Sequence, residues 1–252
     1  MKISIITVVY NGAQTIADTI RSVRNQDYDD IEYIVIDGGS TDGTQDVVAS
    51  FGDAVDTFIS EPDKGIYDAM NKGLRLAGGD VISILNSDDF YAADDVLRTV
   101  ADAFNSENVD AVYGDLVYVD AADPDKVVRF WRSRAMYPRF FEDGNVPPHP
   151  SLFVRRRVYE DIGLFDTTMR LAADHEFMLR LFRIHRRSAR YIPRIFVRMR
   201  LGGASNPSLL NMLRSNREIA RAWKKNDLTI PIKALILRMW LRIRQYVQRP
   251  DH

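Results

Sequence analysis

Strand-like and helix-like segments alternate through the first 115 residues, and this alternation limits the possible folds more than any other feature. Short apolar, β-branched runs occur at 2–9, 32–36, 55–59, 81–85 and 111–113. Segments with apolar residues at helical spacing lie between them, at 13–25, 66–77 and 94–104, and a shorter helix is expected to begin near Ser40. Strands that alternate with helices form parallel pairs through crossovers. We therefore predict an α/β fold with a mostly parallel central sheet flanked by helices.

Polar clusters follow three of the predicted strands, at the point where each strand ends. Tyr10-Asn11-Gly12 follows the first strand, residues 37–40 follow the second and residues 86–89 follow the fourth. In open α/β sheets, ligands bind beyond the carboxyl ends of the strands. We expect the three clusters to converge at one edge of the sheet and to form a binding site there.

Asp88 and Asp89 are adjacent carboxylates at the end of an apolar strand, where they repel each other. A divalent cation would relieve this repulsion, and Mg²⁺ and Mn²⁺ favour carboxylate oxygens together with the phosphates of a substrate. The pair could therefore hold a metal ion that neutralises a diphosphate leaving group. The alternative is an ordinary turn in which both side chains cap backbone N–H groups.

Two further segments suit an anionic ligand. Residues 37–44 form a glycine-rich turn before a helix, where the backbone can approach a ligand closely and the helix N-terminus favours anions. Lys64 lies at the start of another predicted helix and opposes the helix dipole unless an anion is near. A plain strand–turn–helix connection and a local pair of Lys64 with Glu61 or Asp63 explain the same residues. The chain lacks GxGxxG after a strand and lacks GxxxxGK[ST], which disfavours dehydrogenase-type dinucleotide binding and P-loop NTPases.

Asp174 precedes an apolar stripe at 177–182 and has two interpretations. A carboxylate at a helix start is a common N-cap. It is also a candidate general base, provided that it comes within hydrogen-bond reach of an acceptor hydroxyl. Both interpretations fit the local sequence.

Charge is segregated along the chain, although the formal net charge is only −1. Residues 1–128 carry 8 Lys and Arg against 25 Asp and Glu, whereas residues 129–252 carry 26 against 10. We interpret this asymmetry as two surfaces with different partners. A nucleic-acid partner is disfavoured, because one half is strongly acidic and no zinc-finger, RNP-like or zipper pattern is present. The chain has no cysteine, which excludes disulfides and thiolate zinc sites and fits a cytoplasmic protein.

The C-terminal part is basic and contains a predicted amphipathic helix. Residues 230–249 combine aliphatic residues and Trp240 with Lys233, Arg238 and Arg242, a composition typical of helices that lie on anionic lipid. The alternative is a helix that packs on the core or on the second subunit of a homodimer. Helical spacing also occurs at 174–184 and 209–223, whereas the proline-rich stretch 120–150 predicts a long loop.

Four segments, in order, resemble the family 2 glycosyltransferases of the GT-A fold. They read IITVVYN at 5–11, DGGSTDGT at 37–44, a block at 61–73 that leads into LNSDD at 85–89, and HPSLF at 149–153 followed by Ala173-Asp174. The resemblance covers about residues 1–205, and within the family the chain is most similar to bacterial sugar transferases of polysaccharide assembly. Two positions depart from the family pattern: Gly38 stands where many relatives have a second Asp, and Asn86 stands where a stricter acidic motif begins with Asp.

The resemblance implies a role for each matching residue. The nucleotide-binding residues would be Thr7, Tyr10, Asn11, Asp37, Lys64 and Asp88. Asp37 would accept a hydrogen bond from the base, and Asp88 would face the ribose. Asp89 would be the ligand of Mn²⁺ or Mg²⁺, and Asp174 would be the catalytic base. His149 would contact the acceptor or the metal side, with a packed or capping histidine as the alternative.

The resemblance also implies the reaction and the organisation of the chain. An inverting, metal-dependent transferase would move a sugar from a nucleotide-sugar, with a UDP-sugar expected, to a hydroxyl of a glycan or lipid-linked acceptor in cell-surface polysaccharide assembly. Residues 1–205 would form the GT-A domain, with a nucleotide-sugar half at 1–115 and an acceptor half at 116–205, and residues 206–252 would form basic C-terminal helices. The expected location is cytoplasmic, with peripheral attachment to the inner face of the cell membrane as a hypothesis. The alternatives are a sugar-1-phosphate nucleotidyltransferase and a catalytically silent nucleotide-binding scaffold subunit.

Overall fold

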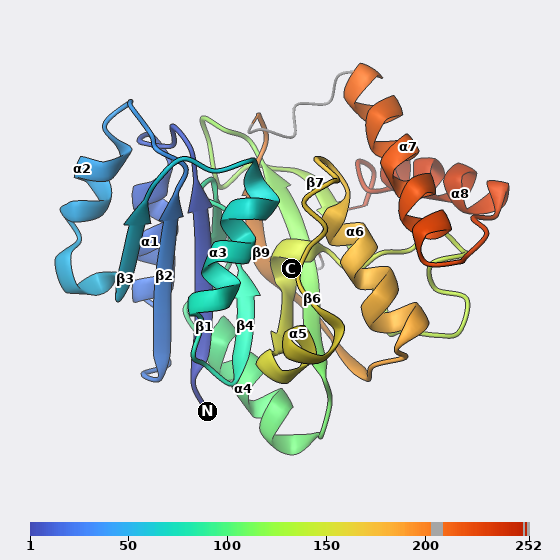
Figure 1. Ribbon diagram of the computed structural model, residues 1–252, viewed down its shortest axis with the longest axis horizontal. Coiled ribbons are helices and arrows are strands. Elements are labelled where there is room, and N and C mark those ends of the chain that lie inside the picture. The colour runs from blue at the N-terminus through green and yellow to red at the C-terminus, as the bar shows by residue number, and fades with distance from the viewer. Residues whose placement is uncertain (203–208, 249, 251–252) are drawn as a thin grey trace.

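The computed structural model describes residues 1–202, 209–248 and 250 (Figure 1). The domain boundary that we predict between residues 205 and 206 lies outside these ranges.

One mixed sheet runs through the described part of the chain and carries helices on both faces (Figure 1). Its strands are β1 (Ile3–Val9), β2 (Ile31–Asp37), β3 (Thr57–Ser60), β4 (Val81–Ile84), β5 (Asp89–Tyr91), β6 (Ala111–Val119), β7 (Val127–Trp131), β8 (Leu152–Arg155) and β9 (Ala189–Arg200). The α-helices are α1 (Ile16–Arg24), α2 (Thr44–Ala49), α3 (Ile66–Leu76), α4 (Val96–Ser106), α5 (Arg156–Ile162), α6 (Ala173–Met178), α7 (Leu209–Lys225) and α8 (Ile232–Arg244). Short 3-10 helices occur at Gly52–Ala54 and His149–Ser151, and a π-helix at Leu179–Ile184 continues α6.

The order of the strands confirms the predicted α/β architecture. β1 lies between β2 and β4 and is parallel to both, and β3 is parallel to β2 at the edge. β8 runs antiparallel to β4 and β6, whereas β6 and β9 are parallel. The full order is β3-β2-β1-β4-β8-β6-β9-β5, and β7 pairs with β6. The carboxyl ends of β1, β2 and β4 therefore meet at one edge.

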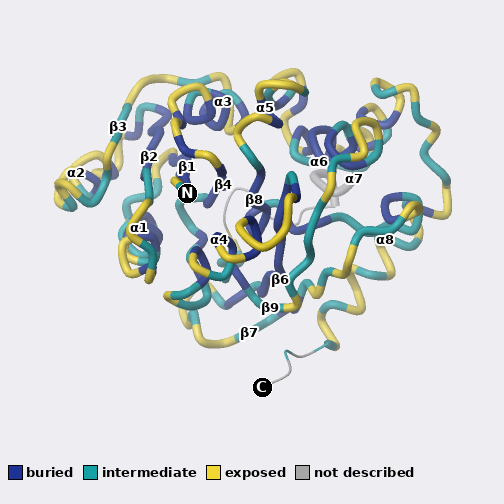
Figure 2. Tube along the Cα trace, turned by 90° about the horizontal axis from the view of Figure 1, so that it is seen from below, coloured by how far each residue is buried: buried dark blue, intermediate teal, exposed yellow. Residues whose placement is uncertain are grey.

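Alternate side chains of the central strands point to opposite faces of the sheet, and each face has its own helices. Ile6 and Ile36 belong to a core that includes residues of α3, α5 and α6. Ile5 and Val35 belong to a second core that includes residues of α1 and α4. Figure 2 shows α3 and α5 on one side of the strands and α1 and α4 on the other. The resulting three layers hold the strand ends in a fixed arrangement.

Several strands differ from the sequence-based expectation. The long loop expected at 120–150 is wrong in part, because β7 lies within it and pairs with β6. The local pattern does not predict β5, β8 or β9 either. β9 contains Pro193, which argues against a strand, but Pro193 falls at an irregularity of the β6–β9 pairing, opposite Gly114. Pairing between distant segments forms these strands, and a local sequence pattern does not report such pairing.

The C-terminal helices pack on α6 and β7. Trp223 of α7 donates from its indole N–H to Nε2 of His175 at 3.2 Å. The N–H of Phe130 in β7 donates to the carbonyl of Gln245, just after α8, at 2.9 Å. The interpretation of α8 as a helix docked on the core is therefore confirmed for one of its faces.

The opposite face of α8 is apolar and exposed. We call this face the outer stripe of α8; it consists of Ile232, Ile236, Met239, Trp240 and Ile243. Figure 2 places α8 at the periphery of the molecule. In the described ranges, no helix has both the length and the apolar character that a membrane span requires.

Candidate active site at the carboxyl ends of the strands

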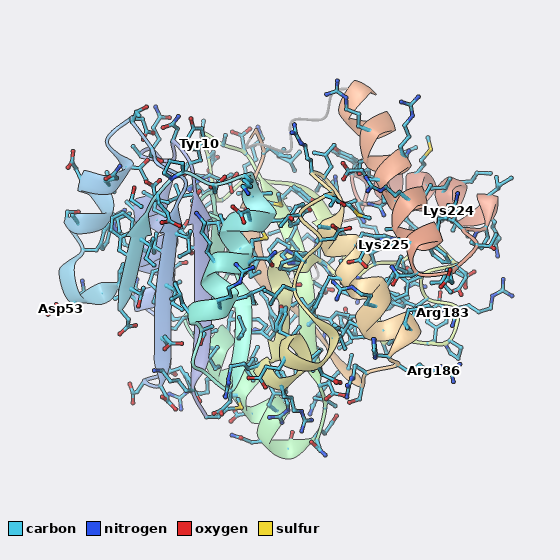
Figure 3. All side chains as sticks on the ribbon, viewed as in Figure 1. Tyr10, Asp53, Arg183, Arg186, Lys224 and Lys225 are labelled. Atoms are coloured by element: carbon cyan, nitrogen blue, oxygen red, sulfur yellow. The ribbon has the colours of Figure 1, made fainter. Side chains whose placement is uncertain are left out.

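Hydrogen bonds join the loops that follow β1 and β2. The N–H of Asn11 donates to Oγ of Ser40 at 2.7 Å, and the N–H of Thr41 donates to Oδ1 of Asn11 at 3.0 Å. Asn11 has a φ of 52°, in the left-handed region that asparagine tolerates better than most residues. Tyr10 is 66% exposed and lies at the same edge of the molecule (Figure 3). The expected convergence of the first two polar clusters is confirmed.

Thr7 and Asp37 lie beneath these loops and are fully buried. The carboxylate of Asp37 accepts hydrogen bonds from the hydroxyl of Ser60, at 2.6 Å, and from the N–H and hydroxyl of Ser40. The hydroxyl of Thr7 is hydrogen-bonded to that of Tyr33 at 3.0 Å. The structure therefore uses both residues to fix the loops and does not expose their side chains at the edge.

A neighbouring carboxylate fills the space beside Gly38. A Cβ atom at this position would collide with Oδ2 of Asp63 and would lie 3.4 Å from Tyr10. Asp63 comes from the segment before α3, where its Oδ1 accepts a hydrogen bond from the N–H of Gly65 at 2.7 Å. An acidic group thus stands next to the position where the sequence departs from the family pattern.

The third polar cluster reaches the same edge and contains a buried acidic pair. A Cβ atom on Gly12 would lie 3.3 Å from Oγ of Ser87. Asp89 is fully buried; its Oδ2 accepts a hydrogen bond from Asn86 at 3.0 Å, whereas its buried Oδ1 has no partner among the described residues. Burial raises the pKa of Asp89 well above its ordinary value, and the charge of Asp88 raises it further. Burial also raises the pKa of Asp88.

These observations fit a hard divalent cation. A cation would stabilise the ionised form of both carboxylates and could use the unpartnered oxygen of Asp89. Arg200 lowers the pKa of both groups without offsetting burial, and its Nη2 donates to Asp18 at 2.5 Å. No three His, Asp or Glu side chains form a ligand group in the part of the chain that the structure describes. Oxygens of a bound diphosphate would therefore complete the coordination.

Asp174 is brought to the start of α3 by a hydrogen bond from Tyr67. It lies in the first turn of α6, and the helix has no side-chain cap hydrogen bond at its N-cap, Ala172. The hydroxyl of Tyr67 donates to Oδ1 of Asp174 at 3.0 Å, across 107 residues of sequence. Asp174 is half-buried. The N-cap interpretation of this residue is therefore wrong, and its carboxylate is held in place from another element.

Lys64 precedes Tyr67 in the same segment and is exposed. Among the described residues no carboxylate lies within ion-pair distance of Lys64, and Glu61 pairs instead with Lys72 at 2.8 Å. The local ion pair considered for Lys64 is therefore not formed. Its ammonium group is available to an anion near the start of α3.

His149 lies close enough to Asp174 to be affected by its charge. Its ring packs edge-on against Phe165, with 5.6 Å between the ring centroids, and Phe165 also contacts Tyr67. Burial lowers the pKa of His149, although the charge of Asp174 opposes this shift. The packed interpretation is supported by the ring contact, while proximity to Asp174 agrees with a place in the site.

The site contains residues that the sequence pattern does not single out. Tyr67 has a visible signal, because it lies three residues after Lys64 in a polar block of a helix with a buried face. Arg200 has no such signal, since it comes from a strand that only the fold brings near Asp89. Arg238 is visible in the sequence only as part of the basic C-terminal helix, and its proximity to Asp174 follows from the fold.

Sequence comparison identifies relatives over most of the chain. Residues 4–163 match the family described as Glycosyl transferase family 2. The chain is 36% identical over 186 residues to an uncharacterized glycosyltransferase of Mycobacterium tuberculosis. The aligned region covers 71% of this chain and 68% of the relative. It is 32% identical over 184 residues to the PGL/p-HBAD biosynthesis glycosyltransferase of Mycobacterium bovis. That aligned region covers 71% of this chain and 69% of the relative.

Solved structures share the fold at low sequence identity. Residues 1–349 of S. aureus TarS, in complex with UDP-GlcNAc, superpose with a TM-score of 0.70 at 19% identity and cover 96% of this chain and 72% of that one. The mannosyltransferase PcManGT from Pyrobaculum calidifontis, in complex with GDP-Man and Mn²⁺, gives a TM-score of 0.67 at 20% identity, with 95% and 69% covered. These similarities establish the GT-A-like fold.

Proposed function

This chain belongs to glycosyl transferase family 2, and from that membership we propose that it transfers a sugar from a nucleotide-sugar, expected to be a UDP-sugar, to a hydroxyl of a glycan or lipid-linked acceptor. The role would be in cell-surface polysaccharide assembly. The complexes of TarS with UDP and UDP-GlcNAc, and that of the mannosyltransferase with GDP-Man and Mn²⁺, support a nucleotide-sugar donor and a divalent metal.

The observation that carries the proposal is the hydrogen bond between Tyr67 and Asp174. It connects the helix that begins beside the donor loops with the carboxylate proposed as the base. Tyr67 occupies only Oδ1, so Oδ2 of Asp174 can accept the proton of an acceptor hydroxyl. Such a carboxylate would serve as the base in a single displacement that inverts the anomeric carbon.

The other residues would bind the donor. Tyr10 and Asn11 would contact the nucleotide from the loop after β1, while Asp37 shapes that loop from below. Lys64 would contact the phosphates, and Asp88 the ribose. Mn²⁺ or Mg²⁺ held at Asp89 would neutralise the charge that develops on the departing diphosphate. Thr7, with its hydroxyl committed to Tyr33, would contribute through the backbone conformation of β1.

Hydrolysis of UDP-sugars in the presence of Mn²⁺ tests this proposal without an identified acceptor. We expect the wild-type chain to release UDP slowly from at least one UDP-sugar, because water can replace the acceptor. Asp174→Asn should lower this rate at least about a hundredfold, the usual contribution of a general base, and should leave the affinity for UDP, measured by calorimetry, within about twofold of the wild type.

Asp161→Asn is the matched control, since Asp161 is an exposed carboxylate on the same half of the chain. It should hydrolyse UDP-sugars at the wild-type rate. Equal loss of UDP affinity and hydrolysis in Asp174→Asn would contradict the assignment of the base. UDP binding without consumption of any UDP-sugar would instead favour the silent scaffold.

A further inference from the structure

A cavity rich in arginine lies beside α8 and outside the donor loops. It has a volume of about 450 Å³ and is open to solvent. It is lined by α8, by β7 and the residues that follow it, by residues 144–146 and by the first part of β9. Six arginines line it: Arg129, Arg132, Arg134, Arg238, Arg242 and Arg244. No Asp or Glu is among the described residues that line it. Arg132 is already engaged, since it acts on Asp115 and Tyr191, but the like charges of the other five favour a bound anion.

Arg238 is fixed with its charge incompletely paired. Its Nη1 is buried and has no hydrogen-bond partner among the described residues. Burial lowers the pKa of Arg238 to about 10, and the charge of Arg242 contributes to the decrease. α8 is held close to the loop at Gly144, where a Cβ atom would lie 2.7 Å from the backbone nitrogen of Arg238. The backbone of Arg238 is therefore held in place, and Nη1 is directed into the protein without a partner among the described residues.

Arg129 of β7 also lines the cavity, and its guanidinium is held in place by its neighbours. It is 6% exposed, its Nε donates to Oε1 of Gln245 at 2.7 Å, and its guanidinium lies 3.9 Å from the ring centroid of Tyr118. Within the described ranges neither Arg129, Arg238 nor Arg242 forms an ion pair with a carboxylate. Stacked, hydrogen-bonded guanidinium groups without a carboxylate partner are well suited to bind phosphate oxygens in pairs.

The position of the cavity indicates which substrate would use it. None of the residues proposed to bind the nucleotide lines it. Arg238 also lines a smaller cavity together with His175, the neighbour of Asp174, and the charge of Asp174 acts on the pKa of Arg238. Arg238 therefore connects the arginine-lined cavity with the surroundings of the proposed base, apart from the residues proposed for the donor.

We propose that this arginine-lined cavity binds a phosphate or diphosphate group of the acceptor substrate. The proposal rests on the function proposed above, because it names the chemical class of the acceptor for that reaction. A phosphate oxygen would partner Nη1 of Arg238, and the paired N–H groups of Arg129 and Arg242 would bind its neighbours. The acceptor hydroxyl would then be presented to Asp174 from a molecule that is anchored by its charge.

Calorimetric titration with inorganic pyrophosphate in EDTA tests the cavity directly. We expect wild-type binding that persists in Asp89→Asn, because the pyrophosphate does not occupy the donor site. Arg238→Gln and Arg242→Gln should each weaken binding at least tenfold. Arg242 is an exposed residue, so Arg242→Gln should keep the fold even if Arg238→Gln does not. Arg186→Gln, an equal charge change at an exposed position labelled in Figure 3, should bind as the wild type does.

The outcomes separate this proposal from the proposed function. Unchanged affinity in both arginine variants, no binding to the wild type, or loss of binding in Asp89→Asn would each overturn the acceptor-phosphate site. Calorimetry with UDP and Mn²⁺ on the same proteins reports the donor site independently. A failure of the glycosyltransferase proposal would therefore be recorded there and not in the pyrophosphate titration.

Discussion

Asp115 shows how one residue in β6 supports the wall of the arginine-lined cavity. It is 3% exposed, and its Oδ1 accepts hydrogen bonds from the N–H of Ser133 at 2.7 Å and from the hydroxyl of Tyr191 at 2.8 Å. Ser133 and Tyr191 both line the cavity. Burial raises the pKa of Asp115 to about 6, although these hydrogen bonds oppose the shift. In the sequence this residue is one acid within an apolar strand and has no distinguishing signal.

The raised pKa predicts a pH-dependent contribution to stability. A carboxyl with a folded-state pKa of about 6 and an ordinary unfolded pKa near 3.8 binds its proton more tightly when folded. Its contribution is therefore fully present below about pH 4 and is lost as the pH rises through about 6. Asp115→Asn keeps the acceptor oxygen without the charge, so we expect the variant to gain stability relative to the wild type over this window, by up to about 3 kcal/mol.

Urea unfolding at several pH values between 4 and 7.5 measures this difference. The free energy of unfolding of the variant minus that of the wild type should increase with pH and then level off above about pH 7. A difference that is constant with pH would contradict the assignment.

At the scale of elements, α8 has two faces with different chemistry. Its inner face carries Arg238 toward the body of the protein, and Gln245, just after the helix, bonds to Arg129. Its outer stripe repeats at i, i+4, i+7, i+8 and i+11. The sequence predicts the amphipathic character. The docked interpretation is confirmed for one face, and the membrane interpretation stays a prediction for the exposed face. Which arginines turn inward could not be predicted, because this depends on the close approach of α8 to Gly144.

We propose that the outer stripe lies on an anionic membrane surface, with Arg244 beside it. Lys233, at the start of the helix, is paired with Asp143 at 3.4 Å. Flotation with vesicles that contain anionic lipid checks this proposal. The triple variant Ile236→Ser, Trp240→Ser and Ile243→Ser should lose most of the flotation of the wild type, because burial of three large apolar side chains in the interface contributes several kcal/mol.

The control for flotation replaces exposed apolar residues elsewhere without a change of charge. Leu76→Ser with Ile184→Ser serves, since both side chains are more than 40% exposed on other elements. Equal flotation of the wild type and the triple variant would remove the membrane proposal and favour a protein partner for the stripe.

At the scale of the whole molecule, part of the charge segregation is satisfied internally. Four arginines of β9 each form an ion pair with an acidic residue of the first 128 positions; the pairs are Arg190–Glu107, Arg194–Asp95, Arg198–Asp125 and Arg200–Asp18. Each partly exposed pair contributes at most about 1 kcal/mol, but together they define how the basic strand lies against the acidic half. The interpretation of the asymmetry as two separate surfaces therefore accounts for only part of it.

The sequence predicts the first half of the molecule far better than the second. Strand–helix alternation there is local, so β1 to β4, α3 and the convergence of their polar loops follow from pattern alone. β8 and β9 depend on pairing with β4 and β6 from distant positions. The predicted division at residue 115 stays a prediction, and β6 runs through that position as one strand.

Because one continuous sheet runs through the described domain, we expect it to unfold in a single transition. Donor binding should raise the midpoint temperature of that transition. With Mn²⁺ present and UDP at about 100 times its Kd, the free energy of unfolding should rise by about 2.7 kcal/mol. For a chain of this size the Tm would increase by roughly 5–10 °C. EDTA should remove most of the increase if Asp89 acts through a metal ion.

Calorimetric scans with UDP, with UDP and Mn²⁺, and with added EDTA measure these shifts. Mn²⁺ alone in Asp89→Asn is the control and should leave the Tm unchanged. Two separate transitions, or a shift by UDP that EDTA does not affect, would contradict the expectation.

The charges that β9 does not pair have a consequence for how the molecule approaches its surroundings. Asp53 lies at one end of the long axis, and Arg186 and Lys224, which form no ion pair within the described ranges, lie toward the other (Figure 3). A body with such poles carries a permanent electric dipole, and a negatively charged layer exerts a torque on it before any atoms touch. The protein would thus arrive already turned, with its basic pole leading, and dissolved salt would weaken this alignment over distances of about 10 Å.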